Sequence, residues 1–413
     1  MPKEGVELMP EPEDRAILTA VDRGAEGYSG EDYGLSDKEA RDLRRPLHGV
    51  SSFVWPYGAV GGAASIVVMI LLWPMIQPLI TPYLPASEWA YESSGVRQLG
   101  DEGLDGSGIK VCIVDTGIDP SHPDFKNMNL AGFRDFYAFQ HDQVRDVSQS
   151  HHGTSMAGLL IANGSGPLQG MAPKVTLSVA VGLGPEGTTG NSVRVADAIQ
   201  WCRVSQRSDI ISLSLGGPFE ASSQQASRSV SGAVQDALDN GIFVVAAAGN
   251  AGPNNIDVST PANVEGVISV GAYDRFLTPW SNSSIGSYLD PYNDLDRVWP
   301  NQKPEILAPG SYILSTVSSQ KSPPYAYSTG TSDAAIFVTA TLALILQDLT
   351  DKGLIDLTID GDDRIFHVKK ALAESAQPVK NQIGHDIRSG YGMLDAVAWR
   401  NAVEASANNW EHP

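Results

Sequence analysis

The sequence predicts an α/β domain with a mainly parallel central sheet and helices on both faces, preceded by one transmembrane helix. Two patterns carry this prediction. After Gly108, short apolar runs alternate with segments whose apolar residues recur at helical spacing, which is typical of parallel strands joined by crossover helices. Before that region, residues 49–87 contain no charged side chain. The 413 residues suffice for one large domain and an appendage.

The first 47 residues are predicted to be a disordered, acidic tail. They hold 12 acidic and 7 basic side chains and few large apolar ones. Such a composition cannot bury enough apolar surface to fold by itself. A second, short tail is expected over residues 406–413. Between the tails we expect a membrane segment with its linker over residues 48–84 and the large domain over residues 85–405.

Residues 57–80 form the predicted transmembrane helix. They read "YGAVGGAASIVVMILLWPMIQPLI", and about 20 helical residues are enough to cross the bilayer core. Aromatic residues flank the run, as they do at membrane interfaces; they are Trp55, Tyr57, Trp73 and Tyr83. Prolines at its end predict a kinked helix end and a stiff linker. A buried helix of a soluble domain is the alternative interpretation.

The position of this apolar run predicts an uncleaved signal anchor. A cleavable signal peptide would begin near the N-terminus, whereas this run starts about 50 residues into the chain. Arg41, Arg44 and Arg45 precede it, and Glu88 and Glu92 are the first charges after it. The positive-inside rule then places the N-terminus in the cytoplasm and the large domain outside. We therefore expect a single-pass membrane protein in contact with the lipid bilayer.

The composition restricts the classes of partner that the protein can bind and predicts the state of its cysteines. The formal net charge of −20 and the pI of about 4.7 argue against nucleic acid and anionic lipid surfaces as partners. Only two cysteines occur, so no disulfide framework or cysteine metal cluster is expected. Cys112 falls in an apolar strand and Cys202 in a helical stretch. Both are predicted to be buried free thiols.

The elements of the large domain follow from periodicity and from turn residues. The predicted strands are 109–115, 209–215, 242–249 and 267–273. The predicted helices are 192–206, 233–241 and 332–349. The helix over residues 332–349 is long and nearly uncharged, so we expect it to be buried at the centre of the domain.

Four polar residues stand where such a sheet presents reactive groups, at or beyond the carboxyl ends of strands. Asp115 ends the first strand, and His152 opens an apolar helix. Asn250 follows the strand "VVAAAG", and Ser332 begins the central helix. Each residue alone would be an ordinary cap or turn residue. Together they supply an acid, a base, a hydroxyl nucleophile and an amide donor, which is the set that acyl transfer requires.

Six ordered motifs then identify a family resemblance. They are "VDTGIDPSHPDF", "HGTSMAG", "SLSLGGP", "AAAGNAGPN", "LAPG" and "GTSDAA". They resemble the subtilisin-like serine proteases (subtilases) over roughly residues 90–400, and the order Asp, His, Ser is that of the family. The resemblance implies the three-layer subtilisin-like fold. It also implies that Ser332 is the nucleophile, His152 the base and Asp115 its orienting acid, while Asn250 and the Ser332 N–H bind the oxyanion.

The resemblance also implies a binding site for extended polypeptides. One edge would pair with the peptide backbone, and an opposite wall and floor would form the first specificity pocket. These substrate-binding residues are Ser214, Leu215, Gly216, Ala247, Ala248, Gly249 and Ser259. Ala251 would lie at the rim, and the small neutral lining predicts that a large uncharged side chain fits. His151 is the alternative to His152 as base, although the "HGT" motif favours His152.

Three residues depart from the family pattern. Asp333, Ile336 and Phe337 stand where relatives usually have methionine, proline and histidine. An acid in the first helical turn is favoured by the helix dipole, by up to about 1 kcal/mol. We therefore expect a membrane-anchored serine endopeptidase in which Asp333→Met changes activity by no more than about tenfold.

Two alternatives remain beside the peptidase. A catalytically weak or inactive peptide-binding protein stays open because of Asp333. An esterase would carry a Gly-x-Ser-x-Gly elbow, which this sequence lacks.

Cofactors and assembly are less constrained by the sequence. The chemistry itself needs no cofactor. The resemblance implies that a structural calcium ion could be bound, but no acid-rich loop identifies its ligands. Asp119 and Asp124 lie near the active strand and are interpreted as turn residues. No oligomeric state is predicted.

Overall fold

The computed structural model describes residues 57–80, 87–187, 192–217, 229–254, 257–357 and 363–407. Contacts divide the chain into two compact units, Met1–Tyr83 and Leu84–Pro413. The tail predicted over residues 1–47 lies outside the described residues, as does most of the tail predicted over 406–413. The larger unit contains all the described strands.

Helix α3 (Tyr57–Ile80) spans the predicted apolar segment. Its side chains from Val60 to Trp73 are exposed, with Leu71 at 70%. A helix that is apolar on all sides is suited to a protein core or a membrane. Among the described residues, the helix that is long and apolar enough to span a membrane is α9 (Thr331–Asp351), with 94% of its apolar window buried; α3 contributes the shorter apolar stretch Val60–Trp73. Burial identifies α9 as a core helix.

A seven-stranded parallel sheet forms the centre of the larger unit, in the order β2-β3-β1-β4-β5-β6-β7. Its strands are β1 (Lys110–Asp115), β2 (Leu130–Asp135), β3 (Thr176–Val181), β4 (Ile210–Leu213), β5 (Phe243–Ala247), β6 (Ile268–Tyr273) and β7 (Ile306–Pro309). After β1 the chain forms β2 and β3 on one side of β1. It then crosses to the other side of β1, where it forms β4. The carboxyl end of β1 is therefore a topological switch point, where such sheets place their sites.

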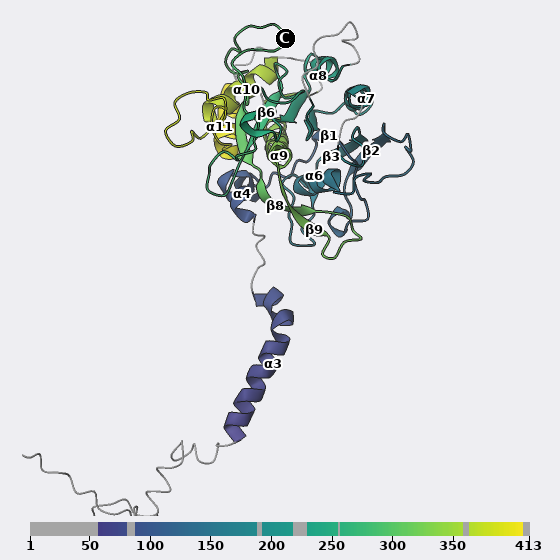
Figure 1. Ribbon diagram of the computed structural model, residues 1–413, viewed down its shortest axis with the longest axis vertical. Helices are drawn as coiled ribbons and strands as arrows, with labels where there is room; N and C mark the ends of the chain where they lie inside the picture. Colours follow the sequence, from purple (N-terminus) through teal and green to yellow (C-terminus); the bar gives the residue numbers. More distant parts are fainter. Residues whose placement is uncertain are drawn as a thin grey trace, which may run out of the picture. The chain divides into compact units, whose positions relative to one another are not determined.

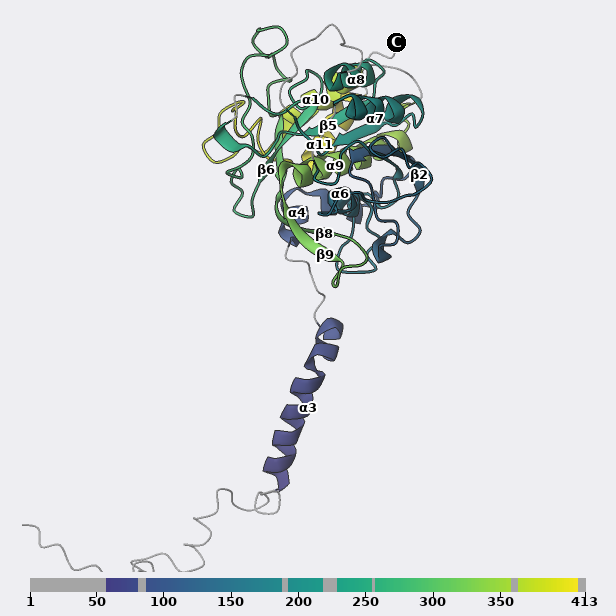
Figure 2. The same ribbon diagram turned by 45° about the vertical axis from the view of Figure 1, so that its right-hand side comes forward.

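Helices form a layer on each face of the sheet (Figures 1 and 2). On one face, α7 (Ser192–Val204) packs over β1 and β3, and α8 (Val230–Leu238) over β5. On the other face, α6 (His152–Ile161) packs over β1, and α9 over β4 to β7. The remaining elements are α4 (Glu88–Ser93), α5 (Val96–Asp101), α10 (Asp363–Ser375), α11 (Ala396–Ala407), the 3-10 turns η2 (Pro123–Phe125) and η4 (Gly252–Asn254), and the antiparallel hairpin of β8 (Ser311–Thr316) and β9 (Tyr325–Thr329).

The predicted central helix is α9, and its burial fixes the position of its N-terminus. Every residue from Thr331 to Leu349 is buried. Leu342, Leu344 and Ile345 are fully buried, and burying each such side chain stabilises the fold by about 1.5–3 kcal/mol. The first turn of α9, which carries Ser332, is therefore held rigidly against the sheet.

The short helices α4 and α5 belong to the core of the larger unit. Tyr91 and Leu99 are fully buried. The Leu314 N–H donates to Ser87 Oγ at 3.2 Å, and the Ala396 N–H donates to the Ser94 carbonyl at 2.8 Å. The segment that follows the apolar helix is thus built into the domain from Ser87 onward.

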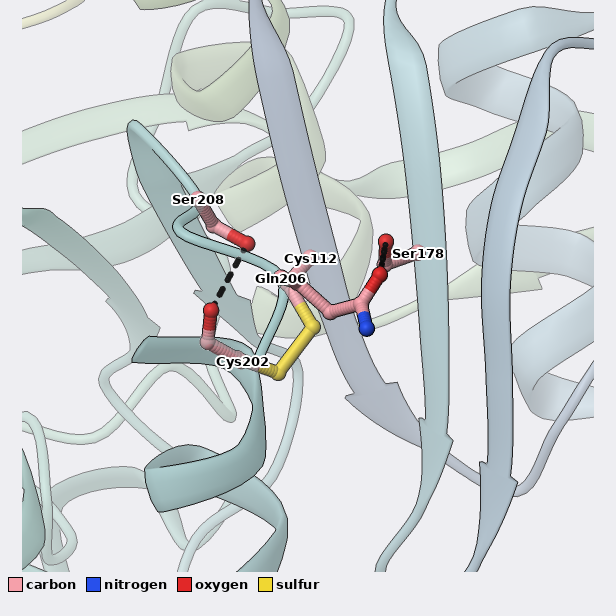
Figure 3. The surroundings of a disulfide bond; sticks show 5 residues. All are labelled: Cys112, Ser178, Cys202, Gln206 and Ser208. Carbon is pink, nitrogen blue, oxygen red and sulfur yellow. Dashed lines mark hydrogen bonds between the residues drawn. A yellow bond between two sulfur atoms is a disulfide. The ribbon is translucent and has the colours of Figure 1, made fainter. Parts of the chain in front are cut away.

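Cys112 and Cys202 form a disulfide between β1 and α7, so the prediction of two free thiols is wrong (Figure 3). The packing of α7 on β1 brings the two Cα atoms to 5.8 Å, within the range for a disulfide. Both residues are fully buried. They are 90 residues apart in the sequence, and only the tertiary contact shows that they are paired.

Removing this disulfide should lower the stability of the domain. A cross-link that closes a loop of about 90 residues contributes about 4–5 kcal/mol in the chain-entropy model. We expect the double variant Cys112→Ala/Cys202→Ala to unfold at a clearly lower urea concentration than the wild type. With reductant present, the two proteins should unfold together. The pairing would be contradicted if the two proteins unfolded at the same urea concentration without reductant and the unfolded wild type contained two titratable thiols.

Candidate active site

The carboxyl end of β1 and the start of α6 bring an acid and an imidazole together. His152 Nδ1 lies 2.8 Å from Asp115 Oδ1 and 3.0 Å from Oδ2. The Asp115 side chain is fully buried, whereas 29% of the His152 side chain is exposed. A carboxylate at this distance accepts the proton of Nδ1, which leaves Nε2 as the proton acceptor. The ring that contacts Asp115 is that of His152, and not that of the alternative, His151.

Asp146 links the two segments that carry Asp115 and His152. This role was not predicted from the sequence. Its Oδ1 accepts the Thr116 hydroxyl proton at 2.8 Å. Its Oδ2 accepts the Thr154 N–H and hydroxyl at 2.9 and 2.7 Å. Thr116 follows Asp115 and Thr154 lies in the first turn of α6, so Asp146 joins the two elements of the pair. The sequence feature that could have identified Asp146 is its position, six residues before His152.

Ser332 lies at the start of α9 beside the loop that follows β4. It is 9% exposed, and its hydroxyl donates to the Ser214 carbonyl at 3.2 Å. The Ser214 hydroxyl donates in turn to the Ser332 carbonyl at 3.2 Å. These reciprocal bonds place the predicted nucleophile next to the predicted peptide-binding edge. Among the hydrogen bonds of the described residues, the Ser332 hydroxyl bonds to Ser214 and the His152 ring to Asp115, and none joins Ser332 to His152.

The Asn250 amide is oriented by Thr331. Asn250 Oδ1 accepts the Thr331 N–H and the Thr331 hydroxyl, both at 2.9 Å. With its oxygen engaged in this way, the amide leaves Nδ2 as the group able to donate to a ligand. A Cβ on Gly330 would lie 3.3 Å from Nδ2, so a side chain there would crowd the donor. The glycine before Thr331 keeps this space open.

The predicted pocket residues also come together. The Ser259 N–H donates to the Ala248 carbonyl at 2.8 Å. A Cβ on Gly216 would lie 2.6 Å from Ser259 Cβ, and one on Gly249 would lie 2.3 Å from Ser259 Oγ. Ser259 therefore lies between residues 214–216 and residues 247–249. Leu215, Ala247 and Ala248 are buried beside it, and Ala251 is exposed.

Carboxylates dominate the electrostatics of the site. Burial lowers the pKa of His152, but the charges of Asp115, Asp333 and Asp146 raise it more, to about 9. Burial also raises the pKa of Asp333 to about 6, against the opposing effects of the Ser328 hydrogen bond and the His152 charge. Asp333 is 1% exposed, and its carboxylate accepts the Ser328 hydroxyl proton.

The described residues contain no group of three or more His, Cys, Asp or Glu side chains that could hold a metal ion. Asp119 accepts the Ser319 N–H and hydroxyl, both at 2.8 Å. Asp124 accepts the Tyr325 hydroxyl and the Gly166 N–H, both at 2.9 Å. Both acids therefore form hydrogen bonds between loops. No calcium ligands are assigned among the described residues.

A buried acid–imidazole pair and a serine at a helix N-terminus are thus placed on a parallel α/β sheet. A family model described as the subtilase family (Peptidase_S8) matches residues 106–392, and the chain belongs to that family. It is accordingly a serine endopeptidase. The predicted resemblance is thus confirmed.

Known relatives agree with this assignment. The chain is 37% identical over 252 residues to the major intracellular serine protease of Bacillus subtilis (strain 168), covering 59% of this chain and 70% of that protein. It is 31% identical over 300 residues to serine protease AprX of the same strain, covering 67% and 66%. Among solved structures, the prenylagaramide maturation protease PagA aligns with a TM-score of 0.59 and 25% identity over 75% of this chain and 98% of that chain.

The raised pKa of His152 makes a prediction about pH. Only the neutral imidazole can remove a proton from the serine hydroxyl, so kcat/KM should keep rising through neutral pH, reach half of its maximum near the pKa of about 9 and level off above it. Asp146→Asn removes one of the contributing charges and should move this rise to lower pH. A wild-type rise already complete near pH 6.5, the ordinary value for histidine, would contradict the electrostatic arrangement.

Proposed function

We propose that this subtilase is anchored in a membrane and cleaves extended polypeptides through an acyl-enzyme formed on Ser332. The observation that carries the proposal is the contact of the buried Asp115 carboxylate with the His152 ring. It lies at the same edge of the sheet at which α9 begins with Ser332. An oriented base near a serine at a helix N-terminus is the arrangement that hydroxyl nucleophiles require.

The chemistry follows from the positions of the four groups. Ser332 Oγ attacks the scissile carbonyl carbon while His152 Nε2 takes its proton, and Asp115 stabilises the resulting imidazolium. The carbonyl oxygen becomes an oxyanion, which receives hydrogen bonds from Asn250 Nδ2 and the Ser332 N–H. One such donor contributes about 3–4 kcal/mol to the barrier reduction. The C–N bond then breaks, the amine leaves with the proton from His152, and water hydrolyses the ester by the reverse sequence of proton transfers.

Substrate binding is proposed along the loop after β4. An extended peptide would pair with the backbone of residues 214–216, and the side chain before the scissile bond would enter the pocket between 214–216 and 247–249. Backbone pairing provides affinity with little sequence preference, whereas the pocket selects the side chain. Ser259 and Ala251 are small and uncharged, which favours a large uncharged residue at this position.

The anchor and the compartment are proposed from separate observations. The exposed, uncharged surface of α3 from Val60 to Trp73 is suited to a lipid environment. The Cys112–Cys202 disulfide is typical of an oxidising compartment outside the cytosol. This supports the orientation inferred from the arginines before the helix, with the N-terminus cytoplasmic and the peptidase domain outside.

The peptidase assignment is tested by covalent labelling of the full-length protein with a fluorophosphonate. We expect wild type to react at one serine, Ser332, because that hydroxyl is activated by His152. Ser332→Ala should not react, and His152→Ala should react far more slowly. Folded wild type that labels no faster than Ser332→Ala would contradict the assignment and favour the alternative, a peptide-binding protein without catalysis.

The anchor is tested by membrane extraction. A charged residue at the centre of a spanning helix costs about 2.5–3.5 kcal/mol, so Val67→Asp/Ile70→Asp should release the protein from membranes at alkaline pH. The matched variant Val67→Leu/Ile70→Leu should stay membrane-bound like the wild type. Wild-type protein recovered in the soluble fraction would sink the anchor proposal and leave the peptidase assignment untouched.

A further inference from the structure

The loop between β5 and β6 carries the proposed oxyanion donor and the proposed pocket floor. Asn250 lies near its start, and Ser259 follows later in the same loop. The Ser259 N–H donates to the Ala248 carbonyl at 2.8 Å. The next residue, Thr260, exchanges two backbone hydrogen bonds with Gly217, at 3.0 and 3.1 Å. The main chain around the floor is thus bonded on one side to the wall 247–249 and on the other to the residue that follows 214–216.

A buried arginine holds both ends of this stretch. The Arg297 side chain is 3% exposed. Its Nη1 and Nη2 donate to Oδ1 and Oδ2 of Asp257 at 3.2 and 2.6 Å, and Nη2 also donates to the Asn263 carbonyl at 3.2 Å. Asp257 and Asn263 lie on either side of Ser259 in the sequence. One guanidinium therefore clamps the stretch 257–263, which contains the proposed floor.

The arginine belongs to a longer bracing segment, residues 282–297, that contacts the loop between β5 and β6 at several points. The Ser284 N–H donates to the Gly249 carbonyl at 2.9 Å, at one wall of the proposed pocket. The Ser287 N–H donates to Asp257 Oδ1 at 3.0 Å. The bracing segment thus contacts both the wall of the pocket and the stretch that contains its floor.

A buried ion pair of this kind fixes geometry more than it stabilises the fold. The cost of taking two charges out of water largely cancels their attraction, so replacing such a pair by apolar side chains often changes the free energy of unfolding little. A planar guanidinium bonds both oxygens of a carboxylate in one orientation, whereas a lysine ammonium acts as a point charge. Arg297 therefore determines where Asp257 lies, and through the main chain where Ser259 lies.

We propose that Arg297 is a positioning residue for the substrate pocket, acting through Asp257 and Asn263 to hold Ser259 at the pocket floor. The inference rests on the proposed function and on the proposed pocket. Because the guanidinium bonds to Asp257 and Asn263, its effect falls on the choice of the side chain before the scissile bond. The reactivity of Ser332 is set by other groups.

The variant that tests this role is Arg297→Met, which keeps a long side chain and removes the clamp. The experiment compares kcat/KM of the full-length protein for two peptides that differ only in having phenylalanine or alanine before the scissile bond. We expect the preference for phenylalanine to fall by about three- to tenfold, because one methylene in an apolar pocket contributes about 10–200-fold and the floor is displaced rather than filled. A small alkyl fluorophosphonate should still label Ser332 at the wild-type rate. Arg297→Lys keeps the charge and should give an intermediate preference.

Arg400→Met is the matched control, because it removes an arginine that is also largely buried but lies on α11. The Arg400 side chain is 14% exposed and pairs with Glu102 at 3.0 Å. Its loss should lower stability and leave the preference between the two peptides unchanged. A folded Arg297→Met variant with the wild-type preference, or an Arg400→Met variant whose preference falls equally, would overturn the inference.

The double variant Arg297→Met/Asp257→Asn keeps the test decisive if Arg297→Met fails to fold. It removes the buried carboxylate that the single variant leaves unpaired, which is the costly part of breaking such a pair. We expect it to be more stable than the single variant, with the preference for phenylalanine still reduced. A wild-type preference in the folded double variant would contradict the role of Arg297.

The two proposals fail separately. Wild type that does not label at Ser332 sinks the proposed function, and the preference is then measured as the affinity for the two peptides, which tests the role of Arg297 without catalysis. Normal labelling with an unchanged preference in the Arg297 variants sinks only the role of Arg297.

Discussion

The site depends on a buried negative charge at the carboxyl end of β1. Asp115 is fully buried, and a carboxylate without partners would be too costly there. The Thr116 N–H at 2.7 Å and the His152 ring at 2.8 Å provide those partners. Because the strand order reverses around β1, this end of the sheet is open to α6 and α9, which bring His152 and Ser332. The Cys112–Cys202 bond fixes the same strand to α7 from the opposite layer.

Much of this arrangement could be predicted because its signals are local. The apolar strands, the long uncharged helix and the six motifs follow one another in the sequence, and they gave the parallel sheet, the central helix and the family. What was missed depends on contacts between distant segments. The pairing of Cys112 with Cys202 appears only when α7 packs on β1. Asp146 looks like an ordinary loop acid until its carboxylate is seen to join Thr116 and Thr154.

Asp333 shows how tertiary context changes the meaning of a local feature. In the sequence it is an acid at a helix start, where the dipole favours it. In the structure it is buried, accepts a hydrogen bond from Ser328 and lies on the face of α9 that packs against Tyr91. Helix α4 thus forms part of the surroundings of the candidate active site. Helix α4, the core helix α9 and the candidate site are parts of one packed unit.

The most direct test of the central claim is a crystal structure of the fluorophosphonate adduct of the peptidase. The account predicts a bond between phosphorus and Ser332 Oγ, with the phosphoryl oxygen within about 3 Å of both Asn250 Nδ2 and the Ser332 backbone nitrogen. The His152 ring should keep its contact with Asp115. An adduct on another residue, or a phosphoryl oxygen directed away from Asn250, would contradict the assignment of these groups.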